Sequence, residues 1–140
     1  MVSDMTKYVD PTRESVRALR DSDMQGPVEM LNLIKFHKEA KYDVAANNAS
    51  KTGEEAYKLY KEELIRIAAG EIVWHAKVKG MFIGPMAEDY DYVMLVRYPS
   101  KEHFLKMMRN PDYKAALVHR YAGVEHTKLM VTQPMSRSKL

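Results

Sequence analysis

The sequence predicts a single α+β domain in which helices cover one face of a four-stranded antiparallel sheet. Three observations support this fold class. Four segments have the alternating or continuous apolar pattern of strands, a well-capped helix lies between the first two, and a pair of short helices lies between the last two. With 140 residues, 46% of them hydrophobic, the chain can form one core, which we place at about 27–134.

The first elements are a short helix and a central strand. Asp10 is a good N-cap and Pro11 suits the first helical position, so we expect an extra N-terminal helix at about 11–20. The segment VEMLNLIKF, residues 28–36, carries large apolar side chains on both alternating faces. This pattern predicts a strand that is covered on both sides.

A polar, Asn- and Ala-rich stretch at 37–51 predicts a long loop, and a helix at about 53–69 follows it. Thr52 and Glu55 have the spacing of a capping box, and apolar residues recur at helical intervals after them. Gly70 is expected to end the helix in the left-handed conformation.

The next two segments predict an antiparallel hairpin. Residues 71–84 alternate, with Ile72, Trp74, Ala76 and Val78 on one face, and 90–98 form a second strand with an apolar centre. Ser100 then caps a short helix, and Asn110 with Pro111 begins another. A last strand is expected at 124–134, followed by a flexible tail at 135–140.

After the N-terminal helix the predicted order is strand, helix, strand, strand, helix pair, strand. This is the split βαβ, or ferredoxin-like, order. Helices on one side leave the other face of the sheet bare, and that face is partly apolar. Because a second copy of the chain can cover it, the sequence predicts a homodimer that forms through the sheet faces.

Composition argues against several functions. The formal net charge is +3 without a basic cluster, so we expect no nucleic-acid partner. No segment has the roughly 20 apolar residues needed to span a bilayer, and the charged start MVSDMTKYVD lacks the apolar centre of a signal peptide. We therefore expect a soluble, cytoplasmic protein with no membrane association. The absence of cysteine is compatible with a reducing compartment.

Neither a metal nor a cofactor is expected. His37, His75, His103 and His126 lack metal-ligand spacing, and no glycine-rich phosphate loop is present.

Several segments together resemble a known family. They are GPVEMLNLIKF, GEEAYKLY, FIGP, DYVMLVRYPSKEHFLKMMRNPDY and HRYAGVEHTKLMVTQP. From about residue 9 to 134 the chain is similar to the small bacterial domains of unknown function numbered thirteen-thirty, in the dimeric α+β-barrel superfamily. The resemblance implies two ferredoxin-like sheets that form a barrel in a homodimer. It implies no reaction, since the wider relatives include cofactor-free monooxygenases, isomerases, cyclases and stress-response proteins.

The chain departs from the family pattern in three places. Ala69 and Gly70 stand where a double glycine is usual, Lys77 and Lys79 add positive charge to the second strand, and the loop at 37–51 is long.

The predicted site centres on His119 and Arg120, at the end of the last helix. On a helical wheel they share a side with Tyr113 and Ala116. One interpretation is that this basic pair caps the helix and interacts with its dipole. The other is that both side chains enter a cavity between helix and sheet, where Arg120 holds an anionic group and His119 transfers a proton as the catalytic acid or base. The family resemblance favours the second, because the pair recurs there.

Four more residues are candidates for substrate binding. Asn32 is a polar residue on an apolar strand face, and Tyr57 and Tyr60 lie on the inward side of the main helix. Each would serve a pocket that needs a few convergent polar groups, or would simply satisfy the core. Arg97, at the end of a strand, either binds substrate or pairs with an acidic neighbour.

The functional hypothesis is a homodimeric small-molecule-binding protein without a cofactor. As an enzyme it would act by proton transfer, isomerisation, cyclisation or a monooxygenase-like reaction on a small aromatic or carboxylate metabolite. The alternative is a non-catalytic ligand-binding or stress-response dimer. A third interpretation has no pocket, with His119 acting only as a cap.

Overall fold

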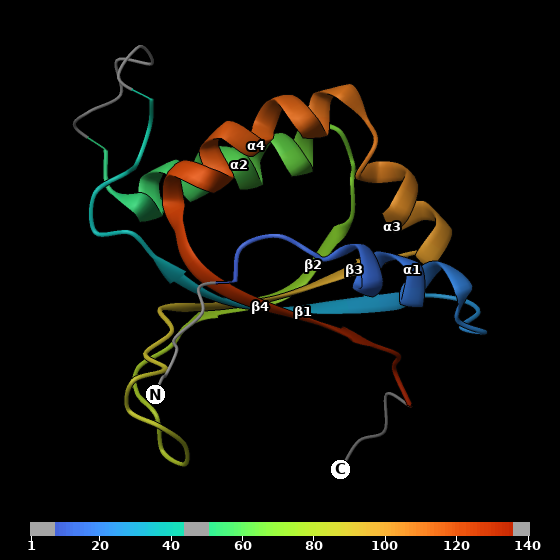
Figure 1. Cartoon of the computed structure of the whole chain (residues 1–140), viewed down its shortest axis with the longest axis horizontal. Helices are drawn as coiled ribbons and strands as arrows, with labels where there is room; N and C mark the ends of the chain where they lie inside the picture. Colours follow the sequence, from blue (N-terminus) through green and yellow to red (C-terminus); the bar gives the residue numbers. More distant parts are fainter. Residues whose placement is uncertain (1–7, 44–50, 136–140) are drawn as a thin grey trace.

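The computed structural model describes residues 8–43 and 51–135, and these form one antiparallel sheet with helices packed on one face (Figure 1). The sheet order is β2-β3-β1-β4. In chain order the elements are α1 (Arg13–Asp21), β1 (Val28–Phe36), α2 (Gly53–Arg66), β2 (Glu71–Lys77), β3 (Tyr92–Tyr98), α3 (Lys101–Met107), α4 (Pro111–Gly123) and β4 (Val124–Thr132). This arrangement confirms the predicted α+β, ferredoxin-like fold.

The core lies between the sheet and the layer formed by α2 and α4. Alternate residues of the two central strands face the helices, which is why β3 is buried at every second position. Met30 and Ile34 of β1 and Met94 of β3 are almost fully buried there, and Tyr57 of α2 packs among them. The alternating pattern in the sequence thus determines which side chains form the core.

The start of α1 differs from the prediction. Thr12, not Asp10, is the N-cap: its hydroxyl accepts a hydrogen bond from the Ser15 amide, and the Ser15 hydroxyl accepts one from the Thr12 amide. This reciprocal pair shifts the helix start to Arg13. The Asp10 carboxylate instead accepts a hydrogen bond of 2.9 Å from the Tyr121 hydroxyl on α4.

The end of α2 also differs. The helix ends at Arg66, and Ala68, not Gly70, takes the left-handed conformation, with φ of 52°. The Ala69 amide then donates to the Leu64 carbonyl, which closes the helix end. Gly70 instead leaves room for the side chain of Tyr98, because a Cβ at Gly70 would lie 2.6 Å from the Tyr98 ring.

Strand β2 is shorter than predicted and is irregular. It ends at Lys77, and its register with β3 shifts between Ile72 and Trp74. Because of this bulge, Ile72 pairs with Val96 on the helix-facing side, whereas Trp74 pairs with Leu95 on the other side. The prediction that Ile72 and Trp74 share a face is therefore wrong. Residues 78–91 connect to β3, and this pairing of β2 with β3 confirms the antiparallel hairpin.

Two predicted segments lie partly outside the described residues. Positions 44–50 of the predicted loop and 136–140 of the predicted tail are not described. Strand β4 ends at Thr132, two residues before the predicted end.

Backbones meet closely where α2 begins. The Gly53 amide donates to the His37 carbonyl, and the His37 amide donates to the Gly123 carbonyl at the end of α4. A Cβ on Gly53 would lie 2.1 Å from the His37 carbonyl oxygen, and one on Gly123 would lie 2.5 Å from the Gly53 carbonyl oxygen. Because glycine has no Cβ, the backbone at the start of α2 can contact the backbone at the ends of β1 and α4.

The face of the sheet away from α2 and α4 has one apolar row and, beside it, a second row that is apolar except for a lysine. Residues directly opposite each other in antiparallel strands share a face, so the register places Trp74, Leu95, Leu31 and Met130 in one row across all four strands. The next row contains Ala76, Val93, Leu33 and Lys128. Trp74 and Met130 are 52% and 45% exposed. We call these eight residues the open face.

Candidate functional site

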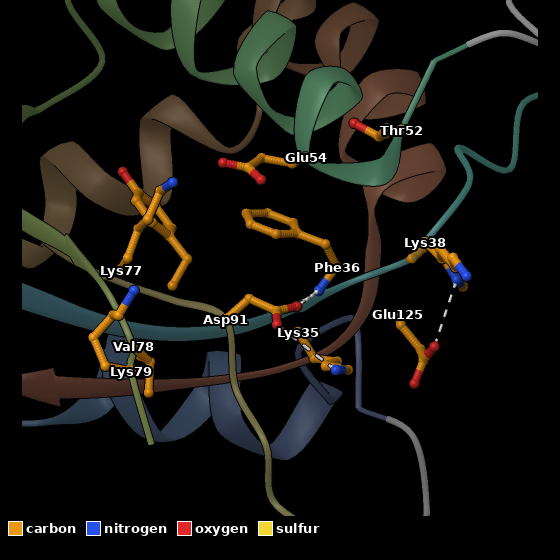
Figure 2. A pocket seen from close by; sticks show the side chains of 12 residues that line it. Lys35, Phe36, Lys38, Thr52, Glu54, Lys77, Val78, Lys79, Asp91 and Glu125 are labelled. Carbon is orange, nitrogen blue, oxygen red and sulfur yellow. Dashed lines mark hydrogen bonds and ion pairs between the residues drawn. The ribbon is translucent and has the colours of Figure 1, made fainter. Parts of the chain in front are cut away.

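Two adjoining cavities of about 560 and 290 Å³ lie beneath the first turns of α2, at the end of β1. They share four lining residues, which are Phe36, Thr52, Glu54 and Tyr92. Figure 2 shows the Phe36 ring of β1 between Glu54 of α2 and Asp91, which precedes β3. Because the two spaces share this wall, we treat them as one site and call it the α2 cavity.

The inner wall of the α2 cavity is aromatic. The ring of Phe36 packs 5.5 Å from that of Tyr57 and 5.9 Å from that of Tyr92, measured between centroids, and Tyr57 and Tyr92 are 6.1 Å apart. Such tilted and edge-on contacts hold the rings in fixed positions. A planar apolar group has a preformed surface here.

The rim of the α2 cavity is rich in charge, with six lysines and four carboxylates. The lysines are Lys35, Lys38, Lys58, Lys61, Lys77 and Lys79, and the acids are Glu54, Glu55, Asp91 and Glu125. Lys35 is neutralised by Asp89 at 3.0 Å and Asp91 at 3.7 Å.

Lys77 and Lys79 differ from Lys35 in having no carboxylate within ion-pair distance among residues 8–43 and 51–135. They stand together on one side of the Phe36 ring (Figure 2). These two cations are therefore open to an anionic ligand.

Three titratable side chains form a hydrogen-bonded chain at the wall. Lys61 Nζ donates to the Tyr92 hydroxyl over 2.9 Å, and the same hydroxyl lies 2.6 Å from His75 Nδ1. The Lys61 ammonium also lies 4.4 Å from the centroid of the Tyr92 ring. The bulge in β2 contributes to this geometry, because it places His75 opposite Met94, on the helix-facing side.

Burial shifts the pKa values of Tyr92 and Lys61 in opposite directions. Burial, with a smaller contribution from the Glu54 carboxylate, raises the pKa of Tyr92 to about 12, so its hydroxyl remains a neutral donor and acceptor at neutral pH. Burial lowers the pKa of Lys61, because its charged form loses hydration, and the carboxylates of Glu54 and Glu62 offset only part of that loss. An anion bound nearby would supply the missing compensation.

The predicted pair on α4 makes other contacts. His119 Nδ1 lies 2.6 Å from the Tyr42 hydroxyl. The Arg120 guanidinium donates to the Val9 carbonyl over 2.7 Å, lies 3.6 Å from the Asp10 carboxylate, and is 14% exposed. Neither residue lines the α2 cavity. Arg120 thus attaches the N-terminal segment to the end of α4, and its charge also acts on buried Tyr57 and Tyr60.

Of the other predicted residues, Tyr57 alone lines the α2 cavity. The Asn32 side chain donates to the carbonyls of Met30 and Met94. The Tyr60 hydroxyl donates to that of Tyr113, and burial raises its pKa. Arg97 lies 3.7 Å from Glu29.

Sequence reasoning missed Phe36, Lys61, Tyr92 and His75. Two of them had a signal: Lys61 lies one turn beyond Tyr57 on α2, and Tyr92 opens an alternating strand. No local pattern brings their three elements together, because the cavity depends on how β1, α2 and the β2–β3 pair converge.

The described residues have neither a metal-binding cluster nor a membrane-spanning helix. Residues 8–43 and 51–135 contain no group of three His, Cys, Asp or Glu side chains placed to hold a metal ion. In the same part of the chain, no helix is long and apolar enough to cross a bilayer.

Comparisons with known proteins identify a relative. The RPA0582 protein of Rhodopseudomonas palustris, a protein of unknown function, is 36% identical over 94% of this chain and 99% of that chain, with a TM-score of 0.81. A crystal structure of methylated RPA0582 has the same identity over 96% of this chain and all of that one, with a TM-score of 0.85. The chain belongs to the RPA0582 family. No protein-family model and no curated protein matches it.

Two more distant structures share the fold of the RPA0582 family. A dabb family protein with a ferredoxin-like fold from Mesorhizobium loti is 15% identical over 80% of this chain and all of that chain, with a TM-score of 0.56. SnoaB, a cofactor-independent oxygenase from Streptomyces nogalater, is 13% identical over 83% of this chain and 98% of that one, with a TM-score of 0.52. At these identities the likeness concerns the fold alone.

Proposed function

We propose that this protein is a homodimer that binds a small aromatic carboxylate in the α2 cavity. The observation that carries the proposal is the combination of a preformed aromatic wall with two lysines, Lys77 and Lys79, that have no carboxylate within ion-pair distance in the part of the chain that the structure describes. Ligand sites are usually concave and mostly apolar, with a few polar groups that fix orientation. The α2 cavity has an aromatic inner wall and a volume suited to a metabolite with one or two rings, and its rim is more highly charged than that of an ordinary ligand site.

The geometry suggests how such a ligand would lie. Its ring would pack against Phe36 and Tyr92, where burial of apolar surface supplies most of the affinity. Its carboxylate would face Lys77 and Lys79 at the rim, and a further oxygen would reach the Lys61 ammonium. An anion near Lys61 would also offset the cost of its partial burial.

The proposal of a homodimer is based on the open face of the sheet. Trp74, Leu95, Leu31 and Met130 cross the full width of the sheet, and the Arg97–Glu29 pair lies in a charged row beside them. An apolar band with a charged border is typical of a protein interface. A second copy would place the same band against it through a two-fold axis.

SnoaB, a cofactor-independent oxygenase, has this fold, so one version of the enzyme hypothesis is a reaction that needs no cofactor. The alternative is a non-catalytic binding protein with the same cavity. Turnover of the bound ligand distinguishes them. Membership in family thirteen-thirty, a cytoplasmic location and a proton-transfer role for His119 with Arg120 stay predictions from the sequence.

Binding of phenylpyruvate, an aromatic carboxylate used as a probe, tests the proposal. We expect isothermal titration calorimetry to show saturable binding to one site per chain. Replacement of both Lys77 and Lys79 by Met should weaken binding about five-fold, since partly exposed ion pairs contribute about 0.2–1 kcal/mol each. Lys114→Met, which changes an exposed lysine of α4 outside the cavity, is the matched control. Equal affinity in the double variant and the control would contradict the proposal.

A further inference from the structure

The chain of Lys61, Tyr92 and His75 connects the α2 cavity to solvent. Lys61 and Tyr92 line the cavity, whereas His75 lines neither of its two parts and is exposed. The Tyr92 hydroxyl is the central group, 2.9 Å from Lys61 Nζ and 2.6 Å from His75 Nδ1. A proton that reaches His75 can therefore leave to bulk water without crossing the cavity.

Chemistry fixes the direction of these hydrogen bonds. An ammonium group only donates, so the Tyr92 oxygen accepts from Lys61. The remaining phenolic hydrogen can then point to His75 Nδ1, which accepts it when the imidazole is neutral. Tyr92 thus has an acceptor behind its own proton and a cation beside its oxygen.

We propose that Tyr92, Lys61 and His75 form a proton-transfer site that enolises an aryl-bearing 2-oxo acid bound in the α2 cavity. This inference rests on the proposed binding function and adds a reaction to it. The class follows from the site: the aromatic wall takes the ring, the rim lysines take the carboxylate, and Lys61 stabilises a developing oxyanion.

The step is balanced within the site. The C–H bond next to the ketone breaks, and its electron pair moves onto the ketone oxygen, where the Lys61 ammonium stabilises the enolate. The released proton passes to the Tyr92 oxygen as the phenolic proton moves to His75 Nδ1. His75 exchanges its proton with solvent, and reversal returns a solvent proton to the carbon. Tyr92 and Lys61 are catalytic residues, and His75 acts through Tyr92.

A second Tyr–His pair supplies a matched control. The Tyr90 hydroxyl lies 3.0 Å from His126 Nε2, with the rings stacked, but neither residue lines the α2 cavity. Tyr90→Phe removes the same hydroxyl from a similar pair. It therefore reports any general effect of losing a tyrosine–histidine hydrogen bond.

Deuterium incorporation at C3 of phenylpyruvate in D₂O, followed by proton NMR, tests the reaction. The wild-type dimer should accelerate exchange above the buffer rate. Tyr92→Phe should lower the enzymatic rate about 100-fold, within the range for general acid–base catalysis, while Tyr90→Phe leaves it unchanged. Lys61→Met should also lower the rate, because it removes the cation beside the oxyanion.

Chemical rescue tests the role of His75. His75→Ala should lower the exchange rate, and added imidazole should restore part of it, since this side chain is exposed and a free base can take its place. A purely structural role would not respond to imidazole. The calorimetric affinity of each variant for phenylpyruvate is measured in parallel.

The outcomes separate the two proposals. Binding without acceleration, or acceleration that Tyr92→Phe does not reduce, would overturn the proton-transfer site and leave the binding function intact. Absence of phenylpyruvate binding would overturn the ligand class on which both depend.

Discussion

Gly53→Ala is expected to destabilise the fold by about 3 kcal/mol, although alanine normally stabilises a helix relative to glycine by about 1 kcal/mol. The added Cβ would lie 2.1 Å from the His37 carbonyl oxygen and 2.8 Å from that of Gly123. Both are backbone atoms joined by hydrogen bonds at the junction of β1, α2 and α4, so neither can move without breaking that junction. Overpacking therefore outweighs helix propensity.

Chemical denaturation with urea, followed by circular dichroism, measures this effect. Gly80→Ala is the control, because Gly80 has no positive φ and a Cβ there would meet no atom within 4 Å. It should change the free energy of unfolding by less than about 0.5 kcal/mol. If Gly53→Ala were as stable as Gly80→Ala, the close junction beneath α2 would be wrong.

Leu31→Glu is expected to convert the proposed dimer into a folded monomer and to weaken self-association at least 100-fold. Leu31 lies in the centre of the apolar row that crosses the sheet, between Leu95 and Met130. In a two-fold interface each substitution appears twice, so two carboxylates would lose hydration near each other. The monomer stays folded, because the open face is not part of the core between sheet and helices.

Light scattering coupled to size-exclusion chromatography, from 1 to 100 µM, would report the masses. Val118→Glu makes the same chemical change at an exposed apolar residue of α4, 47% exposed and on the opposite layer, and should leave the dimer intact. A wild-type monomer at every concentration, or a Leu31→Glu dimer as tight as the wild type, would refute the sheet-to-sheet interface.

The fold could be predicted because its signals are local. The capping box of α2 and the alternation of β3 determine elements that then pack in the split βαβ order. The errors arose where local structure departs from the expected pattern. The bulge at Val73 interrupts the alternation of β2, so the side chains after it point to the opposite face from the one expected. At the end of α2, Ala68 has the positive φ that was expected at Gly70.

The site was less predictable, because contacts far apart in the sequence determine it. A helical wheel groups Arg120 with Tyr113 and Ala116, but the acceptor of its hydrogen bond, the Val9 carbonyl, is 111 residues away in the sequence. Tyr92 meets His75 across a strand pair and Lys61 across the helix–sheet layer. Only Tyr57 belongs both to the predicted set and to the α2 cavity.

The central claim is that ligands bind in the α2 cavity beside Tyr92. Titration of ring-labelled protein with phenylpyruvate, followed by carbon–proton NMR, tests it most directly, with the Tyr92 signal assigned from Tyr92→Phe. We predict that the ring signals of Phe36 and Tyr92 shift and saturate together, while those of Tyr42 and Tyr121, beside His119 and Arg120, stay in place. Shifts at Tyr42 and Tyr121 with Tyr92 unmoved would contradict the account and place the ligand at the end of α4.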